Sequence, residues 1–155
     1  MSSMLCEEKL EVFENGFKDD KHNIEIHVYG GDGRKVLLAL IYELYSPEYG
    51  SEYVYPFECA KEFWGIYLDS SEVKGEEAEL KPLKFISESV KSKIEKELED
   101  IKAPIEVELE KSTIYKVKDG YIVLGKNFLL DHKGRLFVFN KPQVGEIILK
   151  YIWKW

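Results

Sequence analysis

The fold of this chain is decided by residues 83–101, LKFISESVKSKIEKELEDI, near the middle of the sequence. Apolar residues recur there at intervals of three or four, which places them on one side of an α-helix and the charged residues elsewhere. The apolar positions are Leu83, Ile86, Val90, Ile94, Leu98 and Ile101. Pro82 suits the first turn of a helix, and Pro104 blocks its continuation. The stretch therefore predicts a long amphipathic helix over residues 83–101.

The central helix also separates two portions of opposite charge. Residues 1–80 contain 7 basic and 18 acidic side chains, whereas residues 81–155 contain 15 basic and 11 acidic ones, within a net charge of −7. A chain of 155 residues that is 45% hydrophobic has the size and composition of one domain with a substantial core. We expect a single domain over residues 1–155, and a division into an acidic lobe (9–80) and a basic lobe (81–155) is the alternative.

The front portion predicts a β-hairpin followed by two helices. Residues 9–17 are rich in apolar side chains, and residues 23–29 alternate between apolar and polar ones, as a half-buried strand does. After a glycine-rich turn, residues 34–45 have the apolar spacing of a helix. Pro56 then opens a second helix, which is predicted to continue to about Ile66.

The rear portion predicts an antiparallel sheet, because the hydrophobic period changes there from that of a helix to that of a strand. The predicted strands cover residues 105–110, 113–118, 121–124, 128–130 and 136–139. Asp119-Gly120 suits a two-residue hairpin turn, and Gly134 can supply a positive φ in the next one. Asn140 and Gln143 have the spacing of a capping box and predict a terminal helix.

Taken together, the sequence predicts an α+β fold. It has an N-terminal β-hairpin and two helices, a long central helix, and an antiparallel C-terminal sheet with a terminal helix.

Composition argues against several classes of protein. Cys6 and Cys59 lie far apart and in no metal-ligand pattern, so we expect free thiols and no metal site. No apolar run is long enough to cross a bilayer and the N-terminus has no signal-peptide pattern, which favours the cytoplasm and no membrane partner. Lys and Glu make up 42 of the 155 residues, a composition reported for hyperthermophile proteins. No catalytic motif is present, so we assign no catalytic residue and no cofactor.

The first candidate site is the turn Gly30-Gly31-Asp32-Gly33. Gly31 and Gly33 let a phosphate approach the backbone, a helix start offers free N–H groups, and Arg34 and Lys35 add positive charge. The string resembles the glycine-rich motif of NAD kinases and diacylglycerol kinases, although Arg34 stands where those families have threonine and no other motif of theirs is present. The spacing fits neither the P-loop nor the dinucleotide fingerprint. The alternative is a structural turn in which Asp32 caps the helix.

The second candidate site is basic and aromatic. Residues 111–155 carry nine basic and three acidic side chains with aromatic rings interleaved. Binders of single-stranded nucleic acid use lysines that follow phosphates and rings that stack on bases. The candidate residues are Tyr115, Lys116, Lys118, Tyr121, Lys126, Lys133 and Arg135. The alternative is that the rings belong to the core and the lysines to a solvated face.

These features favour a non-enzymatic binding or regulatory module whose rear portion contacts nucleic acid or an acidic protein partner. Two other functions stay open. A small enzyme or ligand sensor would bind a phosphate-bearing ligand at Gly30–Lys35, and a structural subunit of an assembly, including a homo-oligomer, would expose an apolar patch. A continuous positive face would favour the binding module, whereas a closed pocket at the glycine turn would favour the ligand sensor.

Overall fold

A computed structural model describes residues 10–45, 54–66, 80–103, 106 and 108–152 of the chain. These residues form one seven-stranded antiparallel sheet with helices packed on it, so the expected α+β fold is confirmed. The strands are β1 (Glu11–Phe13), β2 (Gly16–Asp19), β3 (Ile24–Tyr29), β4 (Thr113–Val117), β5 (Gly120–Leu124), β6 (Phe128–Leu130) and β7 (Leu136–Phe139).

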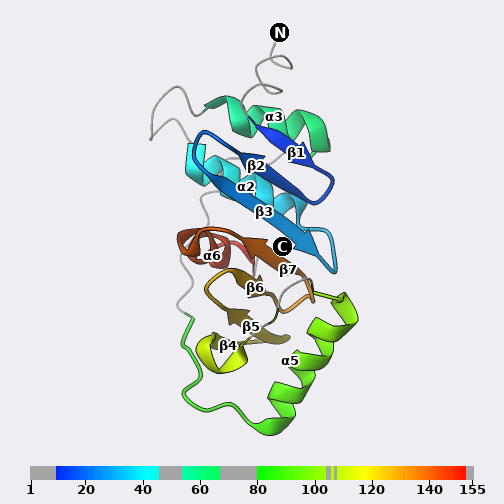
Figure 1. The fold of residues 1–155 in the computed structure, drawn as a ribbon, viewed down its shortest axis with the longest axis vertical. Coiled ribbons are helices and arrows are strands. Elements are labelled where there is room, and N and C mark those ends of the chain that lie inside the picture. Colours follow the sequence, from blue (N-terminus) through cyan, green and yellow to red (C-terminus); the bar gives the residue numbers. More distant parts are fainter. Residues whose placement is uncertain (1–9, 46–53, 67–79, 104–105, 107, 153–155) are drawn as a thin grey trace.

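The strand order β1-β2-β3-β7-β6-β5-β4 joins the front and rear portions of the chain in one sheet. In Figure 1 the strands follow one another from β1 near the top to β4 near the bottom. The join is the β3–β7 pair, in which Ile26 lies opposite Phe139 and Val28 opposite Phe137. The sheet is therefore larger than the predicted C-terminal sheet, because it takes in the N-terminal strands.

Helices cover the two faces of the sheet unequally. The helices are α2 (Arg34–Tyr45), α3 (Val54–Trp64), α5 (Glu88–Ile101) and α6 (Pro142–Leu149). Leu129 of β6 packs in the core that contains residues of α2, α3 and α6, whereas its neighbours Phe128 and Leu130 pack with Ile94 and Leu98 of α5. This alternation is that of a strand buried on both faces. The buried side of α5 packs mainly with residues of the rear strands β4–β7, together with Tyr29 of β3.

The central helix is shorter than predicted, since α5 begins at Glu88 and not at Leu83. Ser87 has an extended backbone, with ψ of 155°, and accepts a hydrogen bond from the Val90 N–H through its Oγ, at 3.3 Å. Serine is favoured as the residue before a helix because its hydroxyl accepts a hydrogen bond from an N–H group in the first turn. Without this bond, that N–H group has no partner within the helix. The first apolar positions of the predicted stripe therefore lie outside the helix.

Two predicted strands are also arranged differently. The predicted strand at residues 9–17 is divided by a turn at Glu14-Asn15 into parts of β1 and β2. The predicted strand at 105–110 falls partly on residues 105 and 107, which lie outside the described residues. Its described end is a 3-10 helix, η3 (Leu109–Lys111), and not a strand.

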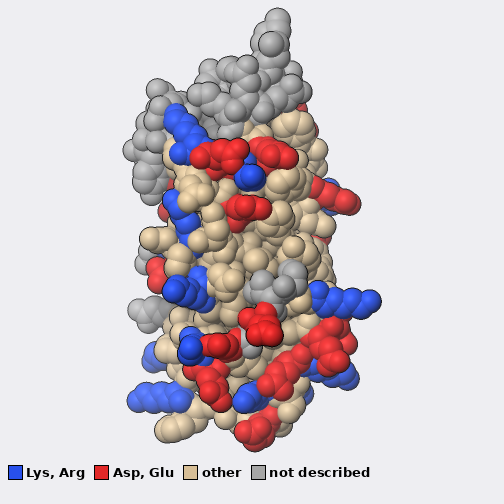
Figure 2. Space-filling model, in the orientation of Figure 1, with Lys and Arg blue, Asp and Glu red and all other residues tan. Residues whose placement is uncertain are grey.

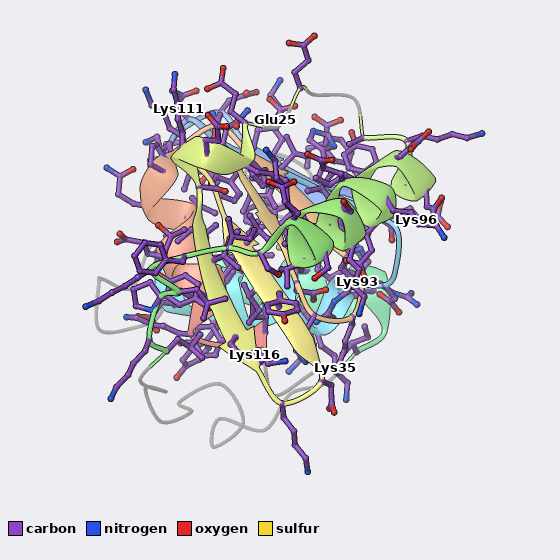
Figure 3. All side chains as sticks on the ribbon, turned by 90° about the horizontal axis from the view of Figure 1, so that it is seen from below. Glu25, Lys35, Lys93, Lys96, Lys111 and Lys116 are labelled. Atoms are coloured by element: carbon purple, nitrogen blue, oxygen red, sulfur yellow. The ribbon has the colours of Figure 1, made fainter. Side chains whose placement is uncertain are left out.

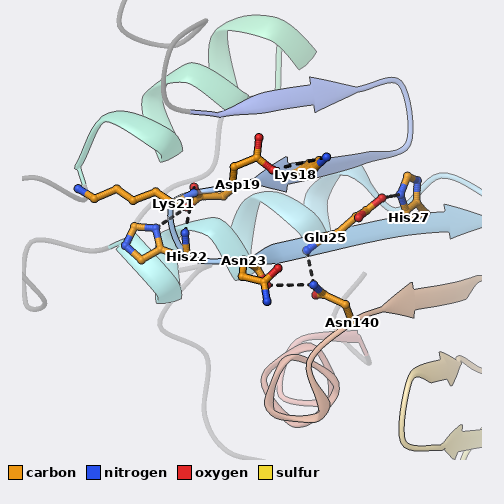
Figure 4. A network of polar contacts seen from close by, with 9 residues as sticks. Lys18, Asp19, Lys21, His22, Asn23, Glu25, His27 and Asn140 are labelled. Atoms are coloured by element: carbon orange, nitrogen blue, oxygen red, sulfur yellow. Dashed lines mark hydrogen bonds and ion pairs between the residues drawn. The ribbon is translucent and has the colours of Figure 1, made fainter.

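Asn140 does not form the predicted capping box with Gln143, because its amide bonds across to the front portion. Its Oδ1 accepts from the Glu25 N–H at 3.0 Å and its Nδ2 donates to the carbonyl oxygen of Asn23 at 2.9 Å, as Figure 4 shows. The N-cap of α6 is Lys141, whose side chain makes no capping bond. Asn140 thus ties the β2–β3 turn to the end of β7.

Other expectations have mixed outcomes. α2 spans the predicted residues, and the hairpin around Gly134 is confirmed. The hairpin near Asp119-Gly120 is also present, but its turn is Lys118-Asp119, one residue earlier than predicted, and Gly120 is the first residue of β5. Cys59 is buried, but it is disulfide-bonded and not the expected free thiol; its partner lies outside the described residues. Among the described helices, none is both long and apolar enough to span a bilayer.

Candidate partner-binding surface

The glycine-rich turn between β3 and α2 packs closely against the turn between β6 and β7. A Cβ on Gly30 would lie 2.5 Å from the carbonyl oxygen of Gly134, and a Cβ on Gly31 would lie 2.9 Å from Cγ of Arg135. Gly30 also has φ of +84°, a conformation that side chains disfavour. Close packing and backbone conformation therefore account for these two glycines without a ligand.

The start of α2 is already occupied by a side chain of the protein. Asp32 accepts a hydrogen bond from the Arg34 backbone N–H at 3.0 Å and from the Arg34 guanidinium at 3.1 and 3.0 Å. The hydrogen bond from the Arg34 side chain lowers the pKa of Asp32. Gly31 and Gly33 lie in the turn, and Arg34 and Lys35 are the first residues of α2. A carboxylate, however, engages the Arg34 amide and guanidinium that a phosphate would need.

Arg135 joins the same two turns. It is only 5% exposed, and its Nε pairs with Asp131, whose carboxylate also accepts the backbone N–H groups of Lys133 and Arg135. Its Nη1 donates to the carbonyl oxygen of Asp32 at 3.2 Å. We call Asp131, Arg135 and the Asp32 carbonyl the turn staple. Because Arg135 is buried in it, this cation is not displayed to a partner.

The aromatic candidates do not form a stacking platform. Tyr115 packs toward the core of α2, α3 and α6, whereas Tyr121 packs toward the core of α5, so their rings lie on opposite faces of the sheet. Lys116 lies over the Tyr121 ring, with Nζ 4.5 Å from the ring centre. Successive bases would need rings on one accessible face. The structure therefore separates the two tyrosines that the sequence grouped.

The lysine candidates are spread over both ends of the rear strands. Lys118 and Lys133 are exposed on the β4–β5 and β6–β7 turns, and Lys126 lies on the β5–β6 turn at the other end. Figure 3 likewise shows Lys116 and Lys111 projecting from opposite ends of the strands. On the face in Figure 2, blue and red side chains are intermingled in both halves of the molecule. That face is not continuously positive.

A different surface lies just before α5, at residues 81–87. Pro82 forms a bridge with Tyr115 of the edge strand β4, and the Leu83 N–H donates to the carbonyl oxygen of Ile114 at 2.7 Å. The other end of the segment is fixed by the N-cap of α5. We call residues 81–87 the tip segment, because they run along the lower end of the molecule in Figure 1. The tip segment is therefore held at both ends, and its chain bends at Lys84.

The tip segment exposes large apolar side chains. Phe85 is 90% exposed, Leu83 39% and Ile86 38%. Lys81 and Lys84 are exposed beside them, and residues 81–87 include no acidic side chain. Clustered, exposed apolar residues with a polar rim mark interaction surfaces more often than isolated ones do. The tip segment is therefore the best candidate for contact with a partner.

The sequence matches the family model described as Ph1570 protein over residues 4–155. The chain belongs to the Ph1570 family. A solved structure described as ORF 1580, a hypothetical protein from Pyrococcus horikoshii, is 62% identical and has a TM-score of 0.84, with 97% of this chain and 93% of that chain covered. It has the same α+β fold. No curated protein matches the sequence significantly.

In this member of the Ph1570 family, the sequence contained a signal for the tip segment. Leu83 and Ile86 continue the apolar stripe of α5, and this spacing predicts that they lie on its buried side. Ser87 followed by the acidic Glu88 is a typical helix start. It indicates that the helix begins at Glu88, although the apolar spacing continues to the residues before it. Phe85 lies off the stripe, so even a longer helix would have left it exposed.

The Ph1570-family chain also has hollows on its surface, and in one of them ion pairs join four of the charged lining residues. One of about 400 Å³ lies between α5 and η3, lined by Lys91, Glu95, Glu108, Leu109, Glu110 and Lys111. Lys91 pairs with Glu110 at 3.9 Å, and Lys111 pairs with Glu108 at 3.0 Å. Among the described residues, no group of three or more His, Cys, Asp or Glu is arranged to hold a metal. The hollow offers no distinctive set of ligand-binding groups.

Proposed function

We propose that this chain is a non-enzymatic binding module and that its tip segment binds an acidic protein segment carrying apolar residues. The observation that carries the proposal is the 90% exposure of Phe85 between the two anchored ends of the tip segment. Aromatic side chains that fill a partner's pocket are typical centres of binding energy. Phe85 is the anchor in this proposal, and Leu83 and Ile86 flank it.

Burial of these three side chains supplies enough free energy for specific binding. Full burial of a phenylalanine, leucine or isoleucine stabilises a complex by about 1.5–3 kcal/mol each. Leu83 and Ile86 are already partly covered, so Phe85 gains most. Because the tip segment is held at both ends, little further conformational entropy is lost when it binds. An affinity in the micromolar range is expected after the costs of association.

The charges of the tip segment favour an acidic partner. Lys81 and Lys84 are exposed within it, and Lys116 is exposed on the adjoining strand β4. Surface cations of this kind raise the association rate and select the partner, while the apolar contacts hold the complex together. An acidic segment with interspersed apolar residues matches both properties.

A protein partner fits this surface better than nucleic acid. Leu83 and Ile86 have no ring to stack on a base, and aliphatic side chains are common in the cores of protein interfaces. The net charge of −7 also opposes nonspecific binding to nucleic acid.

The test is fluorescence anisotropy with a labelled synthetic peptide in which Asp or Glu alternates with Leu or Phe. The wild-type protein is expected to bind this peptide, and Phe85→Ala is expected to raise the Kd about tenfold or more through loss of the aromatic contact. Phe63→Ala is the matched control, because Phe63 is 53% exposed but lies on α3, near the opposite end of the molecule in Figure 1. It should leave the Kd unchanged.

Three results would contradict the proposal. The first is that the wild-type protein does not bind the peptide, or that the two alanine variants weaken binding equally. The second is that Phe85 is required for binding polyuridylate and not the peptide, which would make nucleic acid the partner. The third is that the protein self-associates in sedimentation experiments and Phe85→Ala makes it monomeric, which would make a second copy the occupant.

A further inference from the structure

We infer that His132 makes the turn between β6 and β7 sensitive to acid, so that protonation of its ring opens residues 131–135 locally. Arg135 in this turn donates to the carbonyl oxygen of Asp32 and so joins the rear portion of the chain to the front. An opening of the turn would loosen that join. The tip segment takes no part in this device, so the device and the proposed function do not depend on each other.

In the part of the chain that the structure describes, two buried polar side-chain atoms have no hydrogen-bond partner, and both belong to this turn. They are Nδ1 of His132 and Nη2 of Arg135. Buried polar groups are nearly always paired, so an exception points to strain or to a functional role. His27 shows the contrast, since its Nε2 contacts the Glu25 carboxylate at 2.8 Å.

His132 lies where two turns meet. A Cβ placed on Gly120, the first residue of β5, would lie 3.6 Å from Cβ of His132 and 3.7 Å from its carbonyl oxygen. The β4–β5 hairpin therefore packs against the β6–β7 turn. Within the β6–β7 turn, the Asp131 N–H donates to the Arg135 carbonyl oxygen at 2.9 Å, and the Gly134 N–H donates to the Asp131 carbonyl oxygen at 3.2 Å. These two hydrogen bonds hold the turn closed.

A neutral imidazole suits this place better than a charged one. The neutral ring carries one proton, which can stay on Nε2 and leave Nδ1 as an acceptor. The protonated ring carries a proton on both nitrogens, so Nδ1 would become a buried N–H group with no acceptor in the described chain. An unpaired buried N–H group and a buried charge both cost free energy. Opening of the turn relieves both costs, because water then reaches Nδ1.

The charges around His132 act in both directions, and burial outweighs them. Burial lowers the pKa of His132, and the carboxylates of Asp131 and Asp119 oppose this change. The cations of Lys133 and Arg135 lower the pKa further. The Asp131 carboxylate is also engaged by Arg135 and by two backbone N–H groups, so it is not available as an acceptor for the ring alone.

Acid therefore weakens the closed turn. In the open turn the ring takes up a proton near its ordinary pKa of about 6.5, whereas the closed turn takes it up less readily, so the closed turn loses stability as the pH falls below that value. Glu97 of α5, which Asp131 repels, acts in the opposite direction because its pKa is raised. A substitution of His132 separates the two contributions.

The test is amide hydrogen exchange of the full chain, followed by NMR at about pH 7.5 and about pH 5.5 and corrected for the intrinsic exchange rates. The amides of Gly134 and Arg135 report on the turn, since both donate to Asp131. Their protection should fall about tenfold at the lower pH, because a ring with a pKa of about 6.5 is about 90% protonated there. His132→Asn, which takes up no proton, should abolish the fall. His27→Asn is the matched control and should leave the fall unchanged.

A second measurement needs no variant. Nitrogen-15 shifts of the His132 ring should show Nδ1 without a proton at neutral pH, and the midpoint of the ring titration should lie below about 6.5. A midpoint at or above that value, or a proton on Nδ1 at neutral pH, would overturn the inference, since the buried nitrogen would then have a partner. An equal loss of protection in the wild type and His132→Asn would overturn it as well. So would an equal loss at the amide of Val28, which donates to Asn15 in the front portion, because the whole protein would then be unfolding.

Discussion

The turn staple and the tip segment contrast in how far their side chains are buried. In the turn staple, Arg135 and Asp131 are buried and bonded to each other and to the backbone. In the tip segment, Phe85 is almost fully exposed. The glycine-rich motif that looked like a binding site is therefore part of the framework, and a stretch that looked like framework presents the open surface.

The contrast predicts that the largest loss of stability comes from breaking the turn staple. Arg135→Met would leave the Asp131 carboxylate, which is 0% exposed, without its charged partner. Removing one member of a buried ion pair costs about 3–5 kcal/mol, because the remaining charge is not solvated. The free energy of unfolding, measured by denaturation in guanidinium chloride, should fall by that amount.

The matched control for the turn staple is Arg34→Met. Arg34 also pairs with an aspartate, but the side chains of Arg34 and Asp32 are 40% and 58% exposed. Exposed pairs contribute no more than about 1 kcal/mol, so this variant should stay close to the wild type. Equal losses from the two substitutions would mean that burial does not distinguish the two pairs and that the contrast drawn above is wrong.

A smaller effect is expected where the tip segment meets α5. Ser87→Ala removes the hydroxyl that accepts from the Val90 N–H, and the loss of such a cap costs about 1 kcal/mol. Ser92→Ala, at an exposed position within α5, is the control and should not destabilise the protein, because alanine favours helix. The measurement is the free energy of unfolding of each variant, compared with that of the wild type. If Ser87→Ala costs no more than Ser92→Ala, the helix start is not held by this cap.

The elements that could be predicted from the sequence are those whose signals lie within a few neighbouring residues. The helix at α2 and the hairpin near Asp119-Gly120 followed from apolar spacing and turn chemistry within a few residues. The pairing of β3 with β7 brings residues more than a hundred positions apart together, and no local pattern records it. The same holds for Asn140, whose local spacing suited a cap but whose amide bonds to Asn23 and to the Glu25 backbone.

The candidate site was predictable only in part, for a related reason. The predicted turn at Asp119-Gly120 and the observed turn one residue earlier both place Tyr121 on the other face of the hairpin from Tyr115. The sequence therefore contained this separation. The burial of Arg135 was not recoverable, because it depends on contact between turns from opposite portions of the chain. Periodicity likewise gives the side of a helix that an apolar residue would occupy, but not whether the helix reaches that residue.

The smallest expected effect lies on α5, which runs from the tip segment toward the turn staple. Burial raises the pKa of Glu97, and repulsion by Asp131 and Asp100 raises it further. The folded protein therefore holds this proton more tightly than the unfolded chain, and the contribution of Glu97 to stability falls as pH rises from about 4 to 7. Glu97→Gln should match the wild type at the acidic end and be more stable at neutral pH, by well under about 1 kcal/mol because the carboxyl is largely solvated.

The cause of the Glu97 shift can be separated from the general effect of burial. Asp100→Asn removes one of the two repelling carboxylates and leaves the turn staple in place, so the midpoint of the Glu97 titration, followed by carbon-13 NMR, should move down. An unchanged midpoint would exclude Asp100 as a cause and leave burial and Asp131. Identical stability curves for wild type and Glu97→Gln from acidic to neutral pH would mean that α5 is not packed closely enough on the turn staple for Glu97 to sense its buried carboxylate.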